Sequence, residues 1–82
     1  MQEWPTQLPW RRFVCVLHRL GYVPQKAGRG SVRVFFNATR EPHTVAFREP
    51  HPGGTMGPAI LRKSVRKLML KPEEFMELLA EC

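Results

Sequence analysis

Three histidines are the candidate proton-transfer residues of this chain: His18, His43 and His51. Histidine exchanges protons near neutral pH and therefore suits the acid and base steps of phosphodiester cleavage. His51 lies between two prolines, before an expected helix whose first backbone N–H groups would bind a phosphate. We expect it to contact an anionic ligand. It is also the first candidate for a catalytic base, but for that role the preferred interpretation is a turn residue that packs on Pro50. His43 is the second catalytic candidate or a solvated strand end, and His18 is expected to be structural or exposed.

A basic loop with two glycines is the second feature that suits an anionic ligand. Lys26, Arg29 and Arg33 surround it, and Gly30 and Ser31 lie within it. A loop of this kind between two strands can reach a nucleic-acid groove and contact phosphates. The alternative is a hairpin tip with ordinary surface charges. The loop is not a nucleotide-binding fingerprint, because it lacks the third glycine and the following helix of that motif.

The charge of the chain is concentrated in its first 71 residues. Of the 82 residues, 13 are Lys or Arg and 7 are acidic, which gives a formal net charge of +6. All 13 basic and only three acidic residues lie in residues 1–71, a charge of +10, whereas four glutamates give residues 72–82 a charge of −4. So basic a segment is typical of proteins that bind polyanions, above all nucleic acid, and a solvated basic surface is the alternative.

Three helices are predicted from apolar residues at helical spacing. The first has Pro9 in its first turn, continues to Leu20 and ends at Gly21, while Pro58 and Pro72 open the second and third. The expected apolar stripe of the second helix is Ile60, Leu61, Ser64, Val65 and Leu68. Its opposite, basic face is Arg62, Lys63, Arg66 and Lys67. Such a charged outer face is common on amphipathic helices, so it is the least specific of the three anion-binding features.

Three strands are predicted at residues 22–26, 32–36 and 43–48, and their short connections favour an antiparallel sheet. We expect residues 1–8 and 49–57 to be irregular. The element order predicts an α+β fold of the type α-β-β-β-α, with a three-stranded antiparallel sheet, two helices packed on one face and a short C-terminal helix. This is the element order of double-stranded-RNA-binding domains (dsRBDs).

The aromatic residues are expected mostly in the core. Five of them fall on predicted core stripes: Trp10, Phe13, Phe36, Phe47 and Phe75. Val32, Val34 and Phe36 would face inward from their strand. Phe35 would then be an exposed aromatic side chain that can stack on a base or contact a protein partner.

Length and composition indicate one small domain, residues 1–82 with a core at about residues 8–80. No apolar run approaches the length of about 20 residues that a transmembrane helix needs, and residues 1–10 lack the pattern of a secretory signal. Cys15 is expected on a helix flank or in the core and Cys82 is terminal; two cysteines cannot form a disulfide framework or a four-ligand zinc site. We expect a cytoplasmic protein with no cofactor, metal or membrane contact.

Several short motifs follow one another from about Leu8 to Leu79: Leu20-Gly21-Tyr22, Gln25-Lys26, Gly30-Ser31, Thr44-Val45, His51-Pro52-Gly53, Leu61-Arg62 and Pro72-Glu73-Glu74-Phe75. Their order and spacing resemble those of the HicA family of small bacterial toxins, also called YcfA-like proteins. The resemblance implies a dsRBD-like fold and cleavage of mRNA as an endoribonuclease. It also implies a HicB-like antitoxin that binds and neutralises the toxin.

The chain departs from this family at the residue after Gly-Ser, where the family usually has a catalytic histidine and this chain has Val32. Three alternatives follow: cleavage by another residue, RNA binding without cleavage, or altered chemistry. The residues expected to contact RNA are Lys26, Arg29, Gly30, Ser31, Arg33, His51, Arg62, Lys63 and Arg66. The leading interpretation is a HicA-like toxin that acts on mRNA. The alternative is a catalytically inactive RNA-binding or protein-interaction module, and DNA binding is weaker because no recognition-helix pattern is present.

Overall fold

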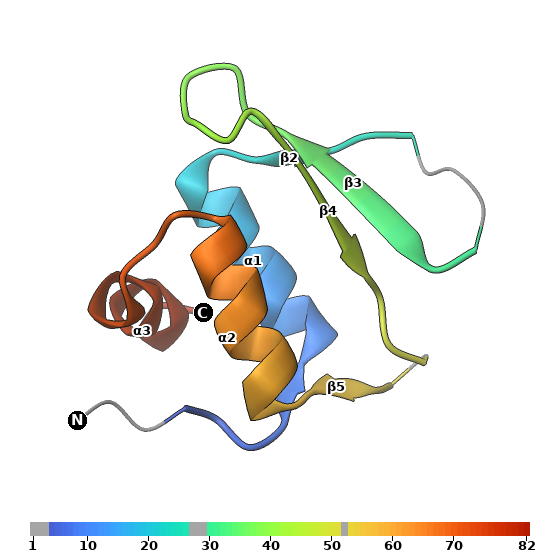
Figure 1. The fold of residues 1–82 in the computed structure, drawn as a ribbon, viewed down its shortest axis with the longest axis vertical. Helices are drawn as coiled ribbons and strands as arrows, with labels where there is room; N and C mark the ends of the chain where they lie inside the picture. The colour runs from blue at the N-terminus through green and yellow to red at the C-terminus, as the bar shows by residue number, and fades with distance from the viewer. Residues whose placement is uncertain (1–3, 27–29, 52) are drawn as a thin grey trace.

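The computed structural model describes residues 4–26, 30–51 and 53–82. In chain order the elements are β1 (Leu8–Pro9), α1 (Trp10–Leu20), β2 (Val23–Pro24), β3 (Val32–Phe36), β4 (Thr44–Arg48), β5 (Thr55–Met56), α2 (Pro58–Lys67) and α3 (Pro72–Ala80). The strand order β2-β3-β4 is antiparallel throughout, which confirms the predicted α+β class with a three-stranded antiparallel sheet. Figure 1 shows α1 and α2 side by side between this sheet and α3. Within the described ranges, no helix has both the length and the apolar character needed to cross a lipid bilayer.

The helices begin and end where local sequence signals indicate. Gly21 ends α1 in the left-handed region at a φ of 100°, and its N–H donates to the carbonyl oxygen of His18 at 3.0 Å. Pro58 and Pro72 open α2 and α3, where the N–H that proline lacks has no helical partner to lose. Local chemistry therefore sets these boundaries, as predicted.

The two faces of β3 are reversed relative to the prediction. Arg33 and Phe35 point toward the helices, and Phe35 is only 3% exposed. Val32, Val34 and Phe36 lie on the other face, where Val32 is 37% and Phe36 is 38% exposed. The expected inward position of Val32, Val34 and Phe36 is therefore wrong, and so is the expected exposure of Phe35.

An ion pair accommodates the arginine on the inner face of β3. The inner face of β3 carries the charged Arg33, which is tolerated because Glu49 lies 2.8 Å from its Nε atom. Phe35 lies two positions after Arg33 and therefore on the same face of the strand. Its ring packs near that of Trp10, with centroids 6.5 Å apart. The inner face of the strand thus carries an arginine whose partner lies 16 positions away in the sequence.

Two segments that were expected to be irregular form a short antiparallel ladder. Leu8 pairs with Met56 and Pro9 with Thr55. The side chains of Leu8 and Met56 are almost completely buried, at 1% and 3% exposure. The prediction for residues 1–8 and 49–57 is therefore wrong at these positions, and the ladder joins the start of α1 to the chain just before α2.

A single core lies between the sheet and the helices. Phe13 is its centre, with ring centroids 5.0 Å from Phe47 and 6.2 Å from Phe75. These three residues are buried as predicted, and Trp10 packs half-buried against them. Ile60, which was expected on the apolar stripe of α2, is instead 59% exposed.

The C-terminal end of α3 is attached to α1. Cys15 and Cys82 form a disulfide with Cα atoms 6.0 Å apart. Arg12 and Arg19 of α1 each donate a hydrogen bond to a backbone carbonyl near the end of α3, at 3.1 and 3.0 Å. Both carbonyls lie at the end of α3, where the backbone hydrogen bonds of the helix stop, and that of Leu79 also accepts from the N–H of Cys82 at 2.9 Å. The pairing of the two cysteines could not be predicted from their positions in the sequence, because it depends on how α1 and α3 pack.

Candidate nucleic-acid interface

A surface pocket of about 570 Å³ lies between the ends of β3 and β4, the chain that follows β4, and the first turns of α2. Gly30, Ser31 and Arg33 contribute to its lining, and so does His51. The structure thus brings together parts of two predicted features, the basic loop and the His51 segment. Lys26 is exposed but does not line the pocket, and Arg29 lies outside the described residues.

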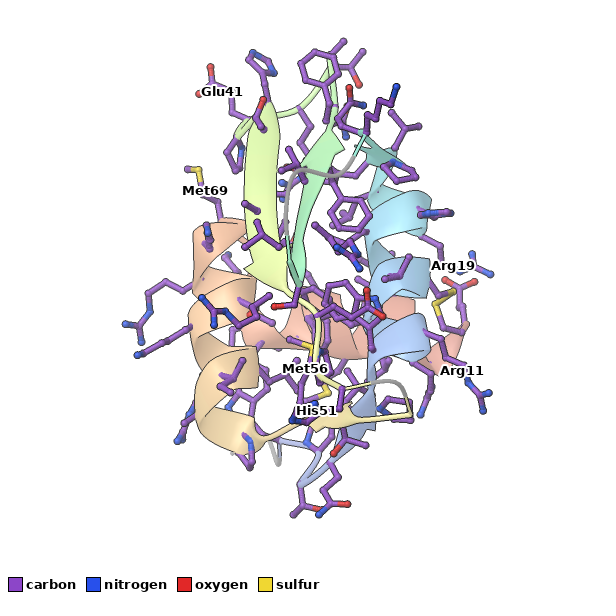
Figure 2. All side chains as sticks on the ribbon, turned by 90° about the vertical axis from the view of Figure 1, so that its right-hand side faces the viewer. Arg11, Arg19, Glu41, His51, Met56 and Met69 are labelled. Atoms are coloured by element: carbon purple, nitrogen blue, oxygen red, sulfur yellow. A yellow bond between two sulfur atoms is a disulfide. The ribbon has the colours of Figure 1, made fainter. Side chains whose placement is uncertain are left out.

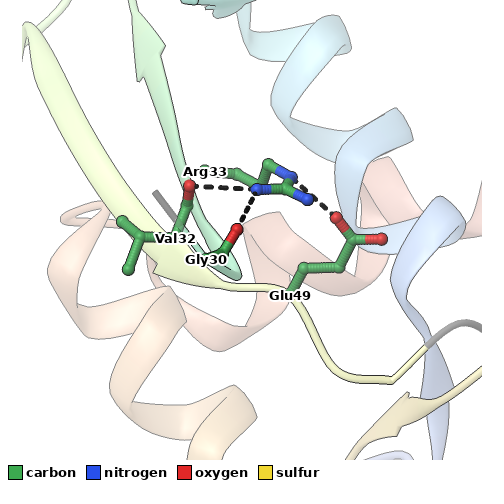
Figure 3. A network of polar contacts seen from close by, with 4 residues as sticks. All are labelled: Gly30, Val32, Arg33 and Glu49. Carbon is green, nitrogen blue, oxygen red and sulfur yellow. Dashed lines mark hydrogen bonds and ion pairs between the residues drawn. The ribbon is translucent and has the colours of Figure 1, made fainter. Parts of the chain in front are cut away.

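Arg33 organises one side of this pocket (Figure 3). Its Nε donates to the Oε1 of Glu49 at 2.8 Å, and its Nη1 donates to the carbonyl oxygens of Gly30 at 2.9 Å and Val32 at 3.2 Å. The side chains of Arg33 and Glu49 are 37% and 30% exposed, so solvent partly screens the pair. Arg33 therefore holds the chain on either side of the pocket in place, and Glu49 offsets its charge.

His51 lies in a tight turn whose shape depends on a glycine. The N–H of Gly54 donates to the carbonyl oxygen of His51, and a Cβ atom at Gly54 would come 2.7 Å from that oxygen. Only glycine fits such a close approach. The exposed His51 lies beside Met56 near the end of the molecule where both long helices begin (Figure 2). It is thus both a turn residue, as one alternative held, and part of the pocket lining.

His43 lies at the connection between β3 and β4 and is not part of the pocket. Its Nδ1 lies 3.0 Å from the carbonyl oxygen of Asn37 and 2.9 Å from that of Arg40, and its ring packs 6.4 Å from that of Phe36. These contacts stabilise the connection. The structure therefore does not bring His43 and His51 to one site.

The basic residues of α2 are exposed and divide between its two sides. Lys67 reaches β4, where its Nζ donates to the carbonyl oxygen of Ala46 at 2.6 Å and lies 5.3 Å from the centroid of the Phe47 ring. Arg62 and Arg66 line a second, smaller pocket of about 310 Å³ on another side of α2. Of the predicted α2 residues, Arg62, Lys63 and Arg66 are therefore at the surface but outside the larger pocket.

The charges of the molecule are segregated in space as well as along the chain. Among the described residues, carboxylates lie within 4.0 Å of just two basic side chains, Arg19 and Arg33. The four cations of α2 and the exposed Arg48 are thus without such a partner in that part of the chain. Four of the glutamates belong to α3 and the residue after it, and α3 lies beyond α1 and α2 from the sheet (Figure 1). Most of the carboxylates therefore lie beyond α1 and α2 from the sheet, while Arg62 and Arg66 line a pocket that reaches Pro72 at the start of α3.

Two charged residues of the pocket escaped the sequence analysis, Arg48 and Glu49. Both come directly before the proline–histidine segment, and Glu49 is one of only three acidic residues in the basic first 71. The position of Glu49, an isolated acidic residue two positions before the candidate histidine His51, was the signal in the sequence that could have identified it as a site residue. Its partner Arg33 could not be identified without the register of β3 and β4.

Comparisons with known proteins do not identify a family or a function for this chain. No protein-family model matches the sequence, and neither a curated protein nor a solved structure matches it. Function is therefore argued from the pocket, the basic surface and the fold.

Proposed function

We propose that this chain is an RNA-binding domain of the HicA-like type with a dsRBD-like arrangement of its elements. The observation that carries the proposal is the basic surface: four cations within the ten residues of α2, together with Arg48. No carboxylate of the described residues lies within 4.0 Å of these cations, so no ion pair offsets their attraction for phosphates, although the Nζ of Lys67 also donates to the carbonyl oxygen of Ala46. Contacts of this kind supply most of the affinity of proteins for nucleic-acid backbones.

The order of elements and the packing of α1 and α2 on one face of the sheet support the same proposal. Domains with this order grip RNA through shape and phosphate contacts. By the resemblance of its motifs to the HicA family, we propose that the target is mRNA and that a HicB-like antitoxin controls the protein.

A pair of charge-matched variants tests the binding surface. In the first, Lys63→Gln and Arg66→Gln remove two cations from α2; in the second, Arg11→Gln and Arg19→Gln remove two from α1. Figure 2 shows Arg11 and Arg19 along the edge of the molecule that lies away from α2. Both variants lower the net charge equally, so a difference between them reports local contact rather than total charge.

We expect the α2 variant to bind labelled RNA about fivefold to tenfold more weakly than wild type in a fluorescence-anisotropy titration, because two phosphate contacts are lost. The α1 variant should bind nearly as well as wild type. Equal weakening in both variants would mean that total charge, not the α2 surface, drives association. Undetectable binding of the wild type would refute RNA binding itself.

Cleavage of the bound RNA is the second candidate function, and a specific observation favours it. His51 shares the pocket with the Arg33–Glu49 pair and with Arg48. In this reaction the imidazole of His51 takes the proton of a 2′-hydroxyl, whose oxygen attacks the neighbouring phosphorus. The bond to the 5′-oxygen breaks, that oxygen takes a proton from water, and a 2′,3′-cyclic phosphate remains. Arg48 would offset the negative charge that grows on the phosphate.

His43 provides a matched control for this candidate, since it is a histidine outside the pocket. His51→Gln should abolish the appearance of cyclic-phosphate ends in purified RNA, and His43→Gln should leave the rate unchanged. Cleavage that survives in His51→Gln would exclude His51 as the base. Wild-type protein that binds RNA without cutting it would leave the binding function and remove the catalytic one.

A further inference from the structure

We propose that the pocket beside His51 receives one unpaired nucleotide, so that this domain recognises single-stranded rather than duplex RNA. The inference rests on the proposed RNA-binding function and names the form of RNA that the site accepts. It differs from the mode that the dsRBD-like element order suggests, in which a duplex is gripped by its shape.

The lining of the pocket is the first observation. Its walls include the apolar side chains of Phe47, Met56 and Ile60, with Arg48 and His51 among its polar residues. Its volume of about 570 Å³ lies in the range of roughly 300–1,000 Å³ that small-molecule sites occupy. Glu49 offsets the charge of Arg33, which leaves Arg48 as the cation of the lining with no carboxylate within 4.0 Å among the described residues. An apolar hollow with this cation beside it matches a nucleotide, which has a flat apolar base and a charged phosphate.

The exposure of Ile60 is the second observation. It lies in the first turn of α2 on the pocket wall, yet 59% of its surface is exposed. Its neighbour Leu61 is fully buried, so the helix does not need Ile60 for the core. An apolar side chain left open next to cations gains contact when a base covers it.

The geometry of RNA then decides between the two forms. In a duplex the bases are stacked and paired, and the surface offered to a protein consists of sugars, phosphates and groove edges. Such a surface cannot fill an apolar hollow. An unpaired base can leave the stack and insert its faces between side chains. The pocket therefore favours a single strand, while the cations of α2 contact phosphates on either form.

Binding of one RNA sequence as a single strand and as a perfect duplex tests this inference. The variant Ile60→Ala removes apolar surface from the pocket. Val23→Ala is its matched control, because Val23 is a similarly exposed branched residue, at 53%, on β2 and outside the pocket. Neither side chain is buried, so both variants should fold, which thermal unfolding followed by circular dichroism verifies.

We expect wild type and Val23→Ala to bind the single strand about tenfold more tightly than the duplex, and Ile60→Ala to lose about fivefold for the single strand only. Equal affinity for the two forms, or an Ile60→Ala variant that binds the single strand like wild type, would overturn the inference while the RNA-binding function stands. Absence of binding to both forms would instead overturn the proposed function.

Discussion

The adjacent residues Phe35 and Phe36 of β3 allow a matched test of how the sheet packs. They are the same residue type in one strand, but their exposures are 3% and 38%. Phe35→Ala would leave a cavity beside Trp10, and removal of a buried phenylalanine ring costs about 3–5 kcal/mol. Phe36→Ala removes a partly solvated ring and leaves no enclosed cavity, so we expect a loss of about 1 kcal/mol. The two variants should therefore differ by roughly 2–4 kcal/mol in the free energy of unfolding.

Urea unfolding followed by far-ultraviolet circular dichroism measures this difference. For a domain of this size the dependence on urea is about 1 kcal/mol per molar, so Phe36→Ala should lower the midpoint by about 1 M and Phe35→Ala by about 3 M or more. Total stability is expected to be only about 4–12 kcal/mol, so Phe35→Leu serves as a milder second variant if Phe35→Ala does not fold. A larger loss for Phe36→Ala than for both Phe35 variants would refute the orientation of β3.

Three further predictions concern stability and use the same urea assay. Reduction of the Cys15–Cys82 disulfide, which spans 67 positions, should lower the free energy of unfolding by about 4 kcal/mol in the chain-entropy description. A reductant should have no effect on the stability of the Cys82→Ser variant. An unchanged urea midpoint of the wild type on reduction would contradict the pairing. Asn37→Ala should cost about 1–3 kcal/mol because the buried side chain donates to the carbonyl oxygen of Leu20 at 2.9 Å, and a neutral result would show that this bond is dispensable. Gly21→Ala should cost about 1–2 kcal/mol, since a Cβ at a φ of 100° is strained and would lie 3.1 Å from Asn37; a gain in stability would contradict the helix end described above.

The fold could be predicted from the sequence wherever the deciding chemistry is local. Gly21, Pro58 and Pro72 fix the helix boundaries through their own backbones. The inward face of β3 could not be predicted, because its sequence has apolar residues on both faces. The buried face is the one that carries Arg33, whose partner Glu49 directly follows β4. The β1–β5 ladder and the disulfide likewise depend on contacts between distant segments.

The candidate site could be predicted from the sequence only where its residues are marked by local features. The loop residues Gly30 and Ser31 and the turn residue His51 could be chosen from residue type and local spacing, and they do line one pocket. Which other residues join them depends on the packing of the ends of β3 and β4 against α2. That packing adds Glu49 to the pocket and leaves His43 at a different connection.

The dependence of RNA affinity on salt tests the central claim most directly. If the four cations of α2 and Arg48 contact the phosphates of a single strand, the slope of log K against log salt should be about −3.5, since each contact contributes about −0.7. The Lys63→Gln, Arg66→Gln double variant should reduce this slope to about −2, because two contacts are lost. Fluorescence-anisotropy titrations at four or more potassium chloride concentrations give both values. A wild-type slope near zero would contradict the account, because binding would then not depend on the basic surface.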